Sequence, residues 1–460
     1  MKTMNATRVR PVLFFLLITG FYCAWSTWFT FEFKECEMFP NYSILAESFS
    51  DARLDIRESF TADTIKKDGK CYLFSGPVPA ILRLPFILLC GWSVATGLMI
   101  ALFCAAVATF FALTLGLLLQ SHTSRPFLVT RSIFIIVFVF NGISLHMVTI
   151  PTLHNESICA AMCFLMISIY LLARVNQRNF QGSPGIAILM GLSLSLSVAC
   201  RFSYVYAVIA VGCLFVCGLL RHADTLSKDK IVTSLSIVAG IGAVSFSALL
   251  WYNYARFGSM LDFGMEHIDT MYRAYFAQGG YFRYDHFPYN FWSFFFRLPH
   301  IVAEFPFVSL PGFLAQTHVF PIPSGDSATV ILNTNELVVS VFFLMPILLL
   351  VLAPPLFRHA GPGFGLPLYR SLVLIFSLQV MSILFTIAAI ARYYYDFLPI
   401  MLLMAFIGAI RLQLDGRLSC FTIGFLAVLS LLLSFALPLN AIQFYAVFIQ
   451  YTSPLLDCLF

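Results

Sequence analysis

Long apolar runs separated by short polar turns recur along almost the whole chain. Most approach the roughly 20 residues that a helix needs to cross a bilayer. The pattern predicts an all-α, polytopic transmembrane helical bundle with about eleven spans. The predicted spans are residues 11–31, 94–119, 132–148, 158–173, 186–200, 203–220, 232–254, 337–353, 371–390, 397–410 and 418–437.

Two further apolar stretches need separate interpretations. Residues 1–31 begin with basic residues, as a signal peptide does, but the apolar part is long and no small-residue cleavage site follows it. We therefore expect a retained first span. Residues 78–90 are apolar but short, and Arg83 and Pro85 interrupt them. This segment is expected to be interfacial or re-entrant.

The distribution of Lys and Arg predicts the orientation of the bundle. Short cytoplasmic loops are enriched in these cations. If the N-terminus lies inside, every predicted cytoplasmic turn carries at least two of them, whereas the short external turns carry only Arg201 and Arg392. The cytoplasmic cations are then Lys2, Arg8, Arg10, Arg125, Arg131, Arg174, Arg178, Arg221, Lys228, Lys230, Arg358, Arg370, Arg411 and Arg417.

Two long external segments, residues 32–79 and 255–336, interrupt the spans and are rich in aromatic residues. In the first, apolar residues recur at helical spacing from Tyr42 to Ile56, opposite several acids, which predicts an amphipathic helix on the membrane surface. In the second, residues 291–310 are dense in Phe, Trp and Pro and are expected to be interfacial too. With no repeat and no soluble domain, residues 1–460 form one predicted domain.

Composition agrees with this architecture. Of the 460 residues, 60% are hydrophobic and 11% are charged, against about 25% charged in soluble domains. A soluble fold must cover itself with polar groups, so membrane lipids are the expected surroundings. The net charge of +5 is small and scattered, which does not indicate nucleic acid. The 12 cysteines show no metal-ligand spacing, and no metal site is predicted.

Acidic residues gather in the first external segment, among them Glu35, Glu37, Glu47, Asp51 and Asp55. One interpretation is a solvated outer face. The other is that one acid acts as a general base at the membrane surface. No cofactor is predicted, although an acidic stripe is compatible with a divalent cation. Cys36 and Cys71 share the segment, so a disulfide is plausible in an oxidising compartment.

Polar residues at the other external turns are further candidates. Arg201 lies between apolar runs, where a cation either faces a cavity or a partner or extends to the interface. Arg392 and Tyr393 begin another external turn; they are either an interface belt or a phosphate site, since guanidinium groups match phosphate geometry. Glu156 either orients a substrate hydroxyl or caps the helix that follows it.

Four stretches resemble the GT-C superfamily of polytopic glycosyltransferases, especially the branch that contains the protein-mannosyl and lipid A aminoarabinose transferases. Their order along the chain and their common external placement carry the resemblance together. They are YSILAESF at 42–49 with RLD at 53–55; YLFSGPVPA at 72–80 through LPF at 84–86; YNYARFGS at 252–259 with FG at 263–264; and RY at 392–393 with DFLP at 396–399.

The resemblance implies inverting glycosyl transfer from a polyprenyl- or dolichyl-phosphate-linked sugar to a lipid, glycan or protein acceptor at the outer or lumenal face. An acid in the first external segment would deprotonate the acceptor. The family places an Asp there, which this chain lacks; Glu37 fits the spacing best, Glu35 is the neighbouring acid, and Glu47 is the second choice. The implied substrate-binding residues are Asp55, Glu156, Arg201, Arg256, Arg392 and Tyr393.

Other functions are open at this point. A transporter or lipid flippase would favour repeated halves and charges inside the spans, which the sequence does not show. A catalytically inactive scaffold subunit is the third possibility, because of the missing Asp. The expected location is a bacterial inner membrane or the eukaryotic endoplasmic reticulum, with the active face outside or lumenal.

Overall fold

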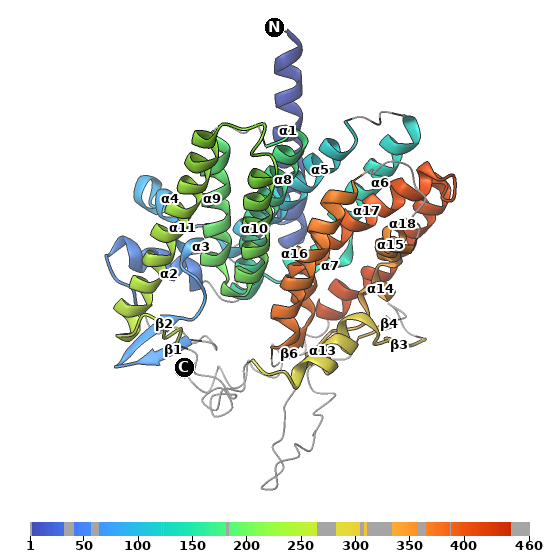
Figure 1. Ribbon diagram of the computed structural model, residues 1–460. Coiled ribbons are helices and arrows are strands. Elements are labelled where there is room, and N and C mark those ends of the chain that lie inside the picture. Colours follow the sequence, from blue (N-terminus) through green and yellow to red (C-terminus); the bar gives the residue numbers. More distant parts are fainter. Residues whose placement is uncertain are drawn as a thin grey trace, which may run out of the picture.

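Helices make up most of the computed structural model (Figure 1). Strands occur in three two-stranded pairs within the described residues. The structure describes residues 2–31, 41–56, 64–120, 122, 124–180, 184–264, 282–303, 308–310, 334–356, 365–386 and 388–442. Glu35, Cys36 and Glu37 lie outside these ranges. The first-choice base Glu37 and the expected disulfide of Cys36 with Cys71 therefore fall outside the described residues.

Seven helical stretches in the described part of the chain are long and apolar enough to cross a membrane, and each matches a predicted span. They are α5 (Thr96–Leu118), α6 with α7 (Arg125–Phe140 and Gly142–Thr149), α8 (Leu153–Gln177), η1 with α10 (Phe202–Tyr204 and Val205–Arg221), α11 (Lys228–Phe257), α16 (Leu366–Leu384) and the stretch Cys420–Ile442, which begins with α18 (Cys420–Ser434).

The other four predicted spans coincide with shorter apolar helices. They are the apolar part of α1 (Lys2–Ser26), α9 (Pro184–Cys200), the segment of η3 (Pro346–Leu352) and α15 (Ala353–Leu356), and α17 (Leu398–Leu414). The total of about eleven spans and the N-inside orientation stay predictions. The all-α class is confirmed, with the three small strand pairs as additions to it.

The predicted span at 337–353 is not one continuous α-helix. It consists of α14 (Val341–Leu344) and the 3-10 helix η3. Pro346 begins η3, and Pro354 and Pro355 follow it. A proline lacks the N–H of a helical hydrogen bond and its ring crowds the preceding turn, which explains the break.

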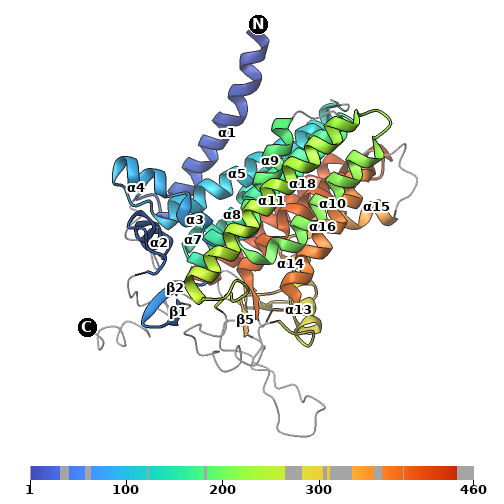
Figure 2. The ribbon, with the colours of Figure 1, turned by 60° about the vertical axis from the view of Figure 1, so that its left-hand side comes forward.

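The bundle is built around α17. Every residue from Leu398 to Leu412 is buried, so the whole circumference of this helix contacts protein. It packs against η3, α16 and α6. On the other side of the molecule, α5 packs against α1 and α8, and α9 lies between α8 and α11. Figure 2 shows α11 along the outside of this group, and little of it is buried.

The first external segment is only partly as predicted. It contains α2 (Asn41–Ser50) and a hairpin of β1 (Thr64–Lys67) and β2 (Lys70–Leu73). The stretch 78–90, expected to be interfacial or re-entrant, contains α3 (Val78–Ile81) and α4 (Leu84–Cys90). The expected helix to Ile56 is wrong: α2 ends at Ser50, and Ile56 pairs with β2 through Cys71.

The apolar face of α2 also has a different partner from the one expected. Tyr42 and Leu45 pack in one cluster with Leu73, Ala80 and Leu153. Protein, not the membrane surface, therefore covers these side chains. By contrast, none of the residues of α4 is buried, and Leu88 and Leu89 are exposed on it.

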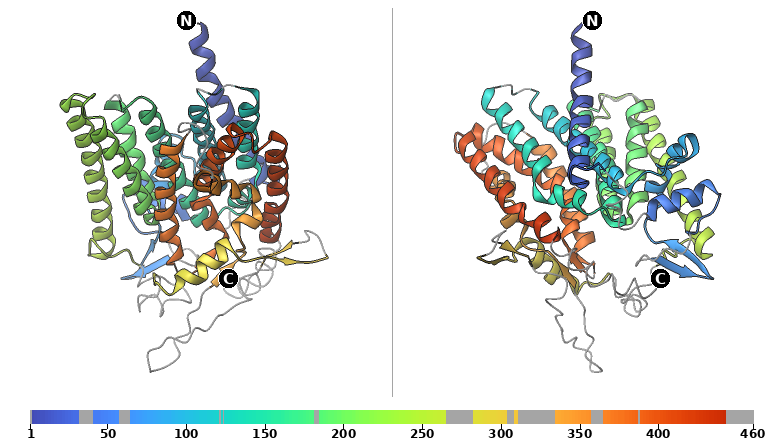
Figure 3. Two further views of the ribbon diagram at one scale, coloured as in Figure 1. Left: turned by 45° about the vertical axis from the view of Figure 1, so that its right-hand side comes forward. Right: turned by 180° about the vertical axis from the view of Figure 1, so that it is seen from behind.

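The described part of the second external segment lies at the same end of the bundle (Figure 3). It contains α13 (His286–Phe295), the pair of β3 (His300–Ile301) and β4 (Val308–Ser309), and β5 (Thr334–Glu336). Strand β5 pairs in parallel with β6 (Ala388–Ile390). One side of α13 is fixed by Asn290, which donates to the carbonyls of Leu384 and Thr386, while Phe291 and Trp292 are exposed.

The close contact at Gly76 gives a test of this packing. A β-carbon at Gly76 would lie 1.9 Å from the carbonyl oxygen of Ala199 at the end of α9. We expect Gly76→Ala to destabilise the protein by about 1–3 kcal/mol, because the backbone on both sides must move. The measurement is the thermal unfolding midpoint in detergent.

The control is Gly240→Ala on α11, where nothing lies within 4 Å of an added β-carbon. Alanine favours a helix over glycine, so this variant should unfold at the same temperature or slightly higher. Equal midpoints for wild type and Gly76→Ala would contradict the close approach of the first external segment to α9.

Candidate functional site

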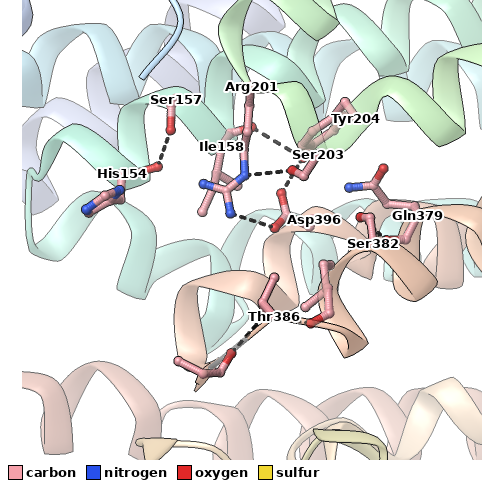
Figure 4. Close-up of polar contacts among 12 residues, drawn as sticks. His154, Ser157, Ile158, Arg201, Ser203, Tyr204, Gln379, Ser382, Thr386 and Asp396 are labelled. Carbon is pink, nitrogen blue, oxygen red and sulfur yellow. Dashed lines mark hydrogen bonds and ion pairs between the residues drawn. The ribbon is translucent and has the colours of Figure 1, made fainter. Parts of the chain in front are cut away.

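The candidate site lies where three breaks in the helical bundle meet (Figure 4). The chain is extended at Arg201, between α9 and η1. The 3-10 helix η4 (Ala391–Asp396) precedes α17, and α8 begins after the capping residue Thr152. Because the continuous helices stop here, polar side chains can enter the interior from several elements at once.

Arg201, Tyr204 and Asp396 form a polar group at this end of the bundle. Tyr204 donates a hydrogen bond of 2.6 Å from its hydroxyl to Oδ1 of Asp396. Nη2 of Arg201 lies 3.6 Å from Oδ2 of the same carboxylate, while Nε donates to Oγ of Ser203 at 3.1 Å. Asp396 is fully buried, whereas 17% of the Arg201 side chain is exposed. The arginine therefore lies between the buried acid and the surface.

The electrostatic environment of Asp396 follows from this burial. Removal from water raises the pKa of the carboxyl group, since water stabilises its charged form. The Arg201 guanidinium, the Tyr204 hydrogen bond and, more weakly, Arg392 act in the opposite direction. Burial therefore disfavours the charged form of Asp396, whereas Arg201, Tyr204 and Arg392 stabilise it.

Two guanidinium groups lie near one aromatic ring in this site. The guanidinium carbon of Arg201 lies 5.1 Å from the ring centroid of Tyr393, and that of Arg392 lies 5.9 Å from it. Tyr393 is buried, and Arg392 is half-buried. The structure therefore brings together three of the residues that the sequence suggested. Two arginines beside one acid can attract an anion, and a phosphate matches their donor geometry.

Glu156 lies in the first turn of α8, but its carboxylate is paired inside the protein. Nη2 of Arg83 donates to Oε2 at 2.9 Å, and Nη1 contacts Oε1. Arg83 also donates to the carbonyl oxygens of Val94 and Pro79. Both side chains are fully buried. This pair joins the segment around α3 and α4 to α8, and a substrate role for Glu156 stays a prediction.

Arg256 is also fixed within the fold. It donates from Nη1 to the carbonyl of Leu73 at 2.7 Å and from Nη2 to Asn253 at 2.8 Å. Its guanidinium lies 3.8 Å from the ring centroid of Tyr252. Arg256 thereby attaches β2 to the end of α11, which is a structural task. A contact with substrate is a prediction that this geometry leaves untested.

The remaining sequence candidates lie in the first external segment. Glu47 is exposed on α2, on the side opposite the buried Tyr42 and Leu45. Asp55 is half-buried, and its Oδ2 lies 3.9 Å from Nη1 of Arg53. Within the described residues, no three His, Cys, Asp or Glu side chains group closely enough to hold a metal ion.

Sequence reasoning missed Tyr204 and Asp396 as site residues. Asp396 begins the DFLP stretch at 396–399, for which the resemblance implies no role of the acid. An isolated acid between two apolar runs is expensive in a membrane and usually has a function or a partner, so its position was an available signal. Tyr204 had no such signal, because tyrosine at the end of a span is ordinary.

Comparison with known proteins gives little further information. No family model and no curated protein matches the sequence. Among solved structures, the apo crystal structure of the Archaeoglobus fulgidus oligosaccharyltransferase is similar, with 12% identity and a TM-score of 0.37. The match covers 86% of this chain and 51% of that one, so the chain spans about half the length of that protein. At this TM-score the likeness decides neither fold nor activity.

The Arg83–Glu156 pair generates a stability prediction. Removing one charge from a buried pair leaves the other uncompensated, which costs about 3–5 kcal/mol. We expect Glu156→Gln to lower the unfolding midpoint strongly in detergent. The double variant Arg83→Met with Glu156→Leu should recover much of the loss, since it leaves no buried charge. A Glu156→Gln protein as stable as wild type would exclude a structural role for the pair.

Proposed function

We propose that this protein is a membrane-embedded glycosyltransferase that uses a sugar linked to a polyprenyl or dolichyl phosphate. The observation that carries the proposal is the convergence of Arg201 and Arg392 on Tyr393 at one end of an apolar bundle. A lipid phosphate has its chain in the bilayer and its charge at the interface. A pair of arginines at the end of the spans suits such a ligand.

In the proposed reaction, a hydroxyl of a lipid, glycan or protein acceptor attacks the anomeric carbon of the donor sugar. The bond from this carbon to the phosphate oxygen breaks, the configuration inverts, and the lipid phosphate leaves with the bonding electrons. The acceptor proton passes to a carboxylate of the first external segment, with Glu37 as first choice and Glu35 and Glu47 as alternatives. Arg201 and Arg392 stabilise the charge that develops on the phosphate.

The position of the polar groups favours this function over transport. Transporters bind substrates near the middle of the bilayer, often where helices are broken. Here η4 directly follows β6, and β6 packs against α13 at the end of the bundle that also carries the β1–β2 hairpin (Figure 1). Such an arrangement suits two substrates that meet at a membrane surface.

The first test removes the guanidinium groups. Arg201→Ala and Arg392→Ala should each weaken binding of polyprenyl phosphate about ten- to a hundredfold, because a hydrogen bond to a charged group contributes about 1.5–3 kcal/mol. Binding is measured on purified protein in detergent. Arg178→Ala, at an exposed position at the C-terminal end of α8, is the charge-matched control and should bind as wild type. Equal binding by all four proteins would remove the phosphate site.

The second test concerns the acid in the first external segment. We expect Glu37→Gln to reduce transfer from a labelled polyprenyl-phosphate sugar at least a hundredfold, in line with loss of a general base. Donor binding should be unchanged, since only the acceptor proton is affected. Glu47→Gln is the comparison at the exposed position on α2. Full transfer by both variants would exclude Glu37 and Glu47 as the base. If wild type binds the donor but transfers no sugar, the inactive scaffold is favoured.

A further inference from the structure

Gln379 is a buried amide whose hydrogen-bonding capacity is unused within the described structure. It lies in α16, and its side chain is fully buried. Neither Nε2 nor Oε1 has a hydrogen-bond partner among the described residues. A buried polar group without a partner destabilises the folded protein, because it has given up its hydrogen bonds to water. A glutamine is therefore a costly choice for this position unless something bonds to it.

The amide lies beside the polar group already described. Helix α16 packs against α10, η1 and η4. Figure 4 shows the Gln379 amide turned toward Tyr204 and Asp396. Oδ2 of Asp396 is also buried without a hydrogen bond in the described part of the chain, since its 3.6 Å separation from Arg201 is too long for one. Helix α16 and the 3-10 helix η4 thus present donor and acceptor atoms without hydrogen bonds toward the same part of the interior.

The combination of these atoms restricts the chemistry of a ligand. The amide offers both donors and acceptors, and the carboxylate offers acceptors. A second anion would be repelled by Asp396, while a cation would meet Arg201. A neutral group that carries several hydroxyls satisfies both partners, because each hydroxyl donates one hydrogen bond and accepts others.

We propose that Gln379 and Asp396 form the subsite for the sugar hydroxyls of the glycosyl donor, on the inner side of Arg201. This rests on the proposed function, in which Arg201 binds the donor phosphate. Arg201 lies between Asp396 and the surface and holds the acid at 3.6 Å without a hydrogen bond. Movement of its side chain toward a phosphate would expose the carboxylate to the attached sugar.

The test compares three ligands on the same purified protein: polyprenyl phosphate, polyprenyl-phosphate mannose and polyprenyl-phosphate glucose. Wild type should prefer one of the two sugar-bearing ligands, and it should bind that ligand more tightly than bare polyprenyl phosphate. Gln379→Met keeps the size of the side chain and removes its polar atoms. It should reduce this preference about three- to tenfold, as expected for one neutral hydrogen bond, and leave binding of bare polyprenyl phosphate unchanged.

Gln413→Met is the matched control. Gln413 is a half-buried glutamine of α17 that accepts a hydrogen bond from Thr130, away from the site. Its replacement should leave the preference for the sugar-bearing ligand intact. Asp396→Asn is the second variant of the subsite, and it should reduce the preference as Gln379→Met does.

The possible results separate this inference from the proposed function. If bare polyprenyl phosphate binds and Arg201→Ala weakens it, while Gln379→Met leaves the sugar preference unchanged, the subsite is wrong and the phosphate site stands. Equal weakening of both ligands by Gln379→Met would also overturn the subsite, since it indicates a general structural effect. Absence of binding by bare and sugar-bearing ligands would overturn both proposals.

Discussion

The cost of burying charge in an apolar bundle determines where this protein places its polar residues. Lipid offers no hydrogen bonds, so each buried charged group must find partners within the protein. Arg83 and Glu156 meet this requirement completely, with a two-pronged ion pair and two backbone carbonyls. Asp396 meets it only in part, since its Oδ2 has no hydrogen bond in the described part of the chain and lies 3.6 Å from Arg201. The first arrangement suits a structural joint, and the second suits a group that can change partners.

The same cost explains how the polar end of the bundle is assembled. Arg83 links α3 and α4 to α8, and Arg256 links β2 to α11. Both arginines donate to backbone carbonyls that would otherwise accept a backbone hydrogen bond in a regular helix or a complete sheet. Irregular backbone can lie close to the spans because these side chains satisfy it. Arg83 and Arg256 are therefore partly replacements for regular secondary structure.

The architecture could be predicted because the dominant signal is local. Apolar runs such as 94–119 and 158–173 show their length directly, and they became α5 and α8. The prediction of a helix to Ile56 was wrong. Ile56 pairs with Cys71, which lies in a strand further along the chain, and the spacing of apolar residues cannot show such a pairing. The hairpin and the parallel pair of β5 and β6 were missed for the same reason: strands of two to four residues carry almost no periodicity.

The sequence indicates several residues of the candidate site, but it does not indicate which of them contact one another. Arg201, Arg392 and Tyr393 were identified from their unusual positions, and the fold brings them together. Glu156 was also a sequence candidate, but its partner Arg83 lies 73 residues earlier, and no pattern in the sequence indicates that pairing. Gln379 was not a candidate, because the sequence does not show which side chains surround it. Its unused hydrogen bonds become visible only when its neighbours are known.

The burial of α17 has a consequence for how the protein responds to its membrane. A helix in contact with lipid must match the thickness of the hydrocarbon layer, and it tilts when the two lengths differ. Helix α11, with 30 residues and little buried surface, is exposed to that adjustment. Helix α17 has 17 residues and protein on all sides, so lipid does not act on it directly. Because η4 continues into α17, Arg392 and Asp396 are anchored to the element that hydrophobic mismatch disturbs least.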